Sequence, residues 1–128
     1  MSSGQARPTE AELTILQVLW DRGPLSVRGV FHVLNVSKTT GYTTVLKTMQ
    51  IMTEKGLLER DESQRPQIYR SSYSQQQTQR QMVRHLVQRV FGGSVRSLVL
   101  QALATKKSSP EEIAAIEKLL DRVKGGEK

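Results

Sequence analysis

The sequence predicts a mainly α-helical chain with one small β-hairpin, and three observations support this fold class. Aromatic residues make up only 5% of the 128 residues, which favours helices with aliphatic faces over an aromatic-rich sandwich. Apolar residues recur at the helical period in six segments. Residues 57–61 and 67–71 instead look extended, and they flank the turn-forming stretch 62–66.

Three short helices are expected before the hairpin. The first starts at a capping box formed by Thr9 and Glu12. The second follows the N-cap Ser26, and the third covers residues 42–55. Three helices followed by a hairpin is the order of a winged helix-turn-helix domain, which we place at residues 8–72.

Three more helices are expected over 74–91, over 94–105 and from 109 through Val123, and Ser94 and Ser109 are the expected N-caps of the last two. The segment 73–128 is close to the size at which a single chain struggles to bury enough apolar area to offset its ordering entropy. A second copy related by a two-fold axis is the simplest cover, so we predict a three-helix C-terminal dimerisation unit. Its predicted interface consists of Leu86, Val90, Leu98, Val99, Leu103, Ile113, Ile116 and Leu120.

The charge distribution favours an anionic partner. Lys and Arg outnumber Asp and Glu by 19 to 12, which gives a net charge of +7. Residues 1–72 carry nine basic and seven acidic side chains, and residues 73–128 carry ten and five. No acid lies between Asp21 and Glu54, or between Glu62 and Glu111. Two acid-free windows therefore bracket the hairpin, and both nucleic acid and an acidic membrane fit this charge.

The third helix is the most informative element. If Val45 and Met49 face inward, a step of about 100° per residue turns the opposite side outward. Hydroxyl, amide and ammonium groups on that side can bond phosphates or base edges in a major groove. The predicted DNA-binding residues are Thr43, Thr44, Lys47 and Gln50 on this helix and Arg65 at the hairpin tip.

Other classes of function find little support in the sequence. The absence of cysteine excludes disulfides, thiolate catalysis and cysteine metal sites. His32 and His85 lie on different elements, and no catalytic or phosphate-loop motif occurs, so we expect no enzyme, no cofactor and no metal. Residues 1–7 lack a signal-peptide core and are expected to be disordered, and no stretch could span a membrane. We expect a soluble cytoplasmic protein.

Four blocks of the sequence together resemble the penicillinase-repressor (BlaI/MecI-type) family, over nearly the whole chain. They are residues 8–13 with 18–20, residues 41–46, residues 54–58 and residues 91–100. The resemblance implies a homodimeric winged-helix repressor of transcription that sits on inverted-repeat operators in an antibiotic response. It also implies relief of repression by proteolysis, with a membrane metalloprotease sensor as partner.

Carried over by position, the resemblance adds Thr48 to the groove-facing residues of the third helix. Ile51 departs from the family, because many relatives have a basic residue there. The bond cleaved in relatives is commonly Asn-Phe, and it corresponds here to Gln101 and Ala102. The rival interpretation is a winged-helix interaction module whose basic surface binds acidic proteins or membranes.

Overall fold

The computed structural model describes residues 7–37 and 40–125, and these residues form two compact units. The first unit ends at Val83 and the second starts at Arg84, so the division falls inside a helix, later than the boundary at 72/73 expected from the sequence. The expected disorder of residues 1–7 lies outside the described residues, except for Arg7. Each unit is described below by itself.

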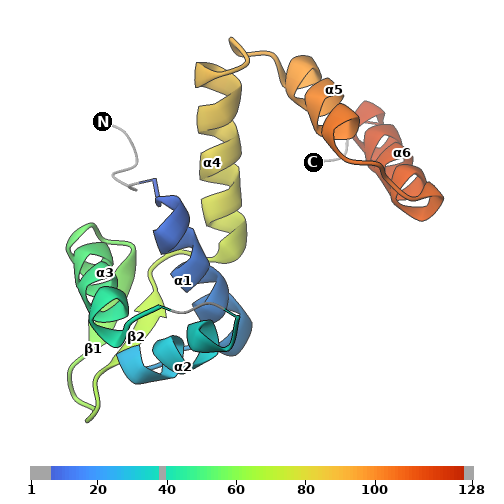
Figure 1. The fold of residues 1–128 in the computed structure, drawn as a ribbon. Helices are drawn as coiled ribbons and strands as arrows, with labels where there is room; N and C mark the ends of the chain where they lie inside the picture. Colours follow the sequence, from blue (N-terminus) through green and yellow to red (C-terminus); the bar gives the residue numbers. More distant parts are fainter. Residues whose placement is uncertain (1–6, 38–39, 126–128) are drawn as a thin grey trace. The chain divides into compact units, whose positions relative to one another are not determined.

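The first unit contains three helices and a hairpin, in the predicted order, followed by the start of a fourth helix (Figure 1). The elements are α1 (Glu10–Arg22), α2 (Val27–Ser37), α3 (Tyr42–Glu54), β1 (Leu58–Asp61), β2 (Ile68–Ser71) and the first part of α4 (Gln75–Arg89).

Side-chain caps explain where the first two helices begin. The amide of Glu12 donates to Thr9 Oγ1 over 3.2 Å, and the amide of Thr9 donates to Glu12 Oε1 over 2.9 Å, which completes the predicted capping box. The hydroxyl of Ser26 accepts from the amide of Gly29 in the same way at α2. The second helix ends at Ser37, three residues beyond Leu34, the last residue of its apolar pattern in the sequence.

The strands β1 and β2 pair antiparallel, with Leu58 opposite Ser71 and Asp61 opposite Ile68. A further link joins the hairpin to the segment before α2, because Leu25 and Tyr69 exchange two backbone hydrogen bonds of 3.1 and 2.8 Å. This link, which the sequence did not suggest, ties β2 to the entrance of α2.

A single apolar core holds the first unit together. Its members come from all three helices, from both strands and from the residue before β1: Ile15, Leu16, Val18, Leu19, Val27, Val30, Val45, Met49, Met52, Leu57, Leu58 and Tyr69. The indole of Trp20 adds a polar tie, donating to Ser71 Oγ and to the carbonyl of Tyr73 over 3.1 and 3.2 Å. The core thus fixes α3 and the hairpin against α1.

The second unit consists of the end of α4, then α5 (Val95–Thr105) and α6 (Pro110–Lys124). Ser94 and Ser109 cap α5 and α6, as the sequence predicted. Neither helix contains a buried residue. The observed fold is therefore mostly helical with one two-stranded hairpin, which confirms the predicted fold class. No helix in residues 7–37 and 40–125 is long and apolar enough to cross a membrane.

Candidate nucleic-acid interface

One face of α3 is exposed, and it carries the helix residues that the sequence pointed to for DNA contact. The opposite face is fixed in the core, because Val45 is 1% exposed and Met49 and Met52 are 0% exposed. We call the exposed side the outer face of α3; it consists of Thr43, Thr44, Lys47, Gln50 and Ile51. These side chains offer hydroxyls, an ammonium group, an amide and apolar atoms, which are the groups that read a major groove.

Thr48 differs from the other predicted residues of α3. Its side chain is half-buried at the edge of the outer face, and its hydroxyl donates to the carbonyl of Thr44 over 2.8 Å. Its proton is thus already used within the helix. Of the predicted residues on α3, Thr48 is the least available for a ligand.

An ion pair in the first unit anchors the far end of α3. Glu12 of α1 is 4% exposed, and its two carboxylate oxygens accept from Lys55 Nζ over 2.7 and 3.0 Å. Lys55 is the C-cap of α3. Burial raises the pKa of the Glu12 carboxyl. Hydrogen bonds from Lys55 and Thr9, together with the positive charge of Lys55, outweigh burial, so the pKa is lowered from its ordinary value of 4.5. The outer face of α3 is therefore held in a defined orientation to α1.

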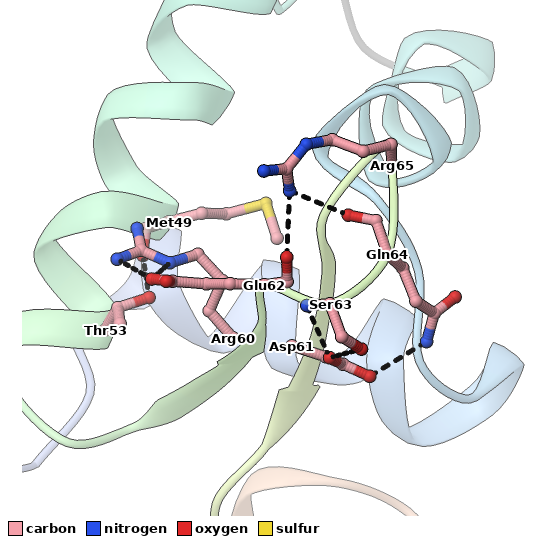
Figure 2. A network of polar contacts seen from close by, with 8 residues as sticks. All are labelled: Met49, Thr53, Arg60, Asp61, Glu62, Ser63, Gln64 and Arg65. Carbon is pink, nitrogen blue, oxygen red and sulfur yellow. Dashed lines mark hydrogen bonds and ion pairs between the residues drawn. The ribbon is translucent and has the colours of Figure 1, made fainter.

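The hairpin and its turn, residues 58–71, form the wing, and ion pairs offset most of its charge. Arg60 pairs with Glu62 over 2.9 Å and Arg70 with Glu59 over 2.8 Å. Arg65 donates instead to the backbone carbonyls of Glu62 and Gln64, over 2.8 and 3.2 Å (Figure 2). Among the described residues, Arg65 is the wing cation without a carboxylate partner.

The carboxylate of Asp61 shapes the turn that presents Arg65. It accepts from the amide and hydroxyl of Ser63 over 3.0 and 2.6 Å and from the amide group of Gln64 over 2.9 Å (Figure 2). Hydrogen bonds from Ser63 and Gln64, with the charge of Arg70, lower the pKa of Asp61 to about 2. The turn therefore stays closed around an ionised Asp61 at neutral pH.

Two basic side chains from separate elements meet at one cleft of the first unit. The cleft has a volume of about 470 Å³ and lies between the start of α2, the Tyr42 edge of α3 and the tip of the wing. Arg28 and Arg65 both line it, together with His32. Arg28 falls in the acid-free window between Asp21 and Glu54, but it was not among the predicted DNA-binding residues. The signal was present in the spacing, since Arg28 and His32 are four residues apart on one helix.

Exposed apolar side chains are frequent in the described residues of the second unit. Six of the eight predicted interface residues are exposed, among them Val90 at 64% and Leu120 at 56%, while Leu98 and Ile116 are half-buried. Val95, Leu100 and Leu119 are also exposed and were not predicted. Exposed apolar side chains that are this frequent are typical of interaction surfaces.

The predicted cleavage pair, Gln101 and Ala102, lies in α5 with both side chains exposed. In the described parts of the chain, no three His, Cys, Asp or Glu side chains gather closely enough to hold a metal ion.

Comparison with known proteins assigns this chain to a protein family. A family model described as penicillinase repressor matches residues 8–122, which include both units of the structure. The chain belongs to the penicillinase repressor family. A penicillinase repressor of Bacillus licheniformis is 22% identical over 120 residues, which cover 94% of each chain. As a member of the penicillinase repressor family, the protein is a DNA-binding transcriptional regulator.

Proposed function

We propose that the protein represses transcription as a homodimer that occupies an inverted-repeat operator. Each protomer places the outer face of α3 in a major groove, and each wing tip reaches the flanking backbone through Arg65. The observation that carries this proposal is the outer face itself, where Lys47 and three hydrogen-bonding side chains lie opposite a fully buried stripe. The proposed activity is occupancy of DNA in the cytoplasm rather than catalysis.

The experiment that tests this proposal is a titration of Lys47→Ala on DNA. The intact protein first selects its operator by genomic footprinting, and binding is then measured on that duplex and on a scrambled duplex at several salt concentrations. If Lys47 contacts a phosphate, affinity falls on both duplexes and the salt slope becomes shallower by about one per contact. If it reads a guanine, discrimination at one base pair relaxes by about 1–3 kcal/mol.

Two comparison variants make the titration specific. Lys118→Ala removes the same charge from an exposed residue of α6 and should bind as the parent does. Arg65→Ala should lose less affinity than Lys47→Ala, with its loss confined to the flanks of the footprint. Unchanged binding by Lys47→Ala at low and high salt would contradict the proposal. Tighter binding to acidic lipid vesicles than to any duplex would favour the interaction-module alternative.

We propose that the second unit supplies the dimer contact. Support comes from α5 and α6, which have no buried residue while Val99, Leu103 and Leu120 are 42–56% exposed. A partner copy would remove this apolar area from water at roughly 25 cal/mol per Å². The two-fold axis of such a dimer would match the symmetry of an inverted repeat.

We further propose that repression is relieved by cleavage in α5, between Gln101 and Ala102, by a membrane metalloprotease sensor. The pair is exposed on a helix that lacks a core, so local opening costs little. A cut there separates α6 from the rest of the interface. The test is to expose cells to a cell-wall-active antibiotic and measure the repressor's mass. Derepression with the 128-residue chain intact would mean that another event does the switching.

A further inference from the structure

The cleft between α2, α3 and the wing lies outside the outer face of α3 and supports a further inference. Its wall is formed by Arg28, His32, Tyr42, Arg65 and Gln67 over an apolar floor that includes Leu46. Among the residues that the structure describes, no Asp or Glu lines the cleft. A cleft with two guanidinium groups and no carboxylate is built for an anion.

The guanidinium of Arg28 is already held in place. It lies over the ring of Tyr42, with its central carbon 4.7 Å from the ring centroid. Tyr42 in turn packs edge-on against Phe31, with ring centroids 5.8 Å apart. Stacking uses the face of a guanidinium and leaves its N–H edge free, and Arg28 has no carboxylate partner among the described residues.

The position of the cleft indicates what kind of anion could bind there. One wall, Tyr42 and Leu46, lies on α3 directly beside the outer-face residues Thr43 and Lys47. Another wall is the wing tip at Arg65. When a helix fills a major groove and a hairpin reaches the flanking backbone, one sugar-phosphate strand must run between them. That strand would pass over the mouth of this cleft.

We propose that the cleft receives one backbone phosphate of the bound DNA, with Arg28 as its main ligand. Tyr42 positions the Arg28 guanidinium, and His32, one turn further along α2, offers an N–H to the same group. Arg65 closes the site from the wing side. This inference rests on the proposed function and adds to it a contact that reads position on the duplex rather than sequence.

The test begins with Arg28→Gln, which removes the charge from an exposed side chain and leaves the core intact. Affinity for the operator and for scrambled DNA should fall by roughly ten- to a hundredfold, the range for losing hydrogen bonds to a charged group. The salt slope should become shallower by about one per protomer. The matched control, Arg22→Gln on the exposed last turn of α1, should bind as the parent does.

A phosphate-specific readout separates this contact from a general loss of charge. Ethylation interference with the parent should mark one phosphate per half-site that Arg28→Gln no longer depends on. Replacing that phosphate with a neutral methylphosphonate should weaken binding by the parent more than it weakens binding by Arg28→Gln, which retains His32 and Arg65 at the site. Tyr42→Leu should weaken the same interference signal, and Tyr42→Phe, which keeps the ring, should retain it.

The binding of the two variants separates the phosphate site from the proposed DNA-binding function. If Lys47→Ala loses affinity while Arg28→Gln keeps the parent's affinity and interference pattern, the phosphate site is wrong and the DNA-reading function stands. If neither variant changes binding to any duplex, the proposed function itself fails. Additive effects of Arg28→Gln and the methylphosphonate would also overturn the site, because groups that contact each other must be coupled.

Discussion

At the scale of single residues, one carboxylate performs two structural tasks. Glu12 completes the capping box of α1 through Thr9 and also pairs with Lys55 at the end of α3. Its side chain is only 6% exposed, whereas that of Lys55 is 30% exposed. A charge buried to this degree needs its partner, because an unpaired carboxylate in the interior costs several kcal/mol. The orientation of the outer face of α3 therefore depends on a pair at the C-terminal end of this helix.

Lys55→Met should destabilise the protein by about 3 kcal/mol at pH 7, since it leaves Glu12 buried without its counter-ion. Adding Glu12→Gln should recover most of this loss, because a neutral amide can still cap α1. Because the pKa of Glu12 is lowered in the folded state, the stabilisation of the parent is present above about pH 4.5 and lost as the pH falls further. Urea unfolding at pH 7 and pH 3 measures both effects. A Lys55→Met variant as stable as the parent at pH 7 would contradict this account.

At the scale of elements, the sequence predicted most of what local chemistry decides. Helix starts at Thr9, Ser94 and Ser109 follow from caps that involve residues only three positions apart, and all three are present. The pairing of Leu25 with Tyr69 was missed because it joins residues 44 positions apart, with no periodic pattern to signal it.

In the candidate site, too, some features could be predicted from local sequence and others could not. The outer face of α3 could be predicted because helical geometry fixes it once the buried stripe is known. The cleft at Arg28 could not, because its walls come from α2, α3 and the wing, and only the folded chain brings these together. The local periodicity of a sequence does not show which distant elements will lie side by side.

The orientation of α3 can be tested by two substitutions of apolar residues on the same helix. Met49→Ala should cost about 3 kcal/mol, because Met49 is fully buried and its truncation leaves a cavity. Ile51→Ala should change stability by less than about 0.5 kcal/mol, because Ile51 is 43% exposed on the outer face. Urea unfolding of both variants decides the matter. Equal losses would mean that α3 is rotated and that its outer face is wrongly assigned.

At the scale of the whole molecule, the two units differ in how many apolar side chains they bury. The first unit buries twelve apolar residues in one core, whereas α5 and α6 bury none. Helices this exposed gain little from tertiary packing within their own chain, and isolated helices of this length are marginal in water. Folding of the second unit is therefore expected to depend on a partner surface, which links its stability to protomer concentration.

Leu98→Asp should convert the proposed dimer into monomers, because a dimer would have to bury an unpaired carboxylate at this half-buried position of α5. Ala115→Asp adds the same charge on the side of α6 away from Ile113 and Leu120, and should leave the dimer intact. Sedimentation velocity measures both.

The monomer should also bind a full operator far more weakly, because each half-site loses the millimolar-range effective concentration that a tethered second subunit provides. On a duplex with one half-site, Leu98→Asp should equal the parent's intrinsic affinity, since the outer face of α3 is unchanged. An intact dimer for Leu98→Asp, or a monomeric parent, would show that the exposed apolar surface serves a different partner.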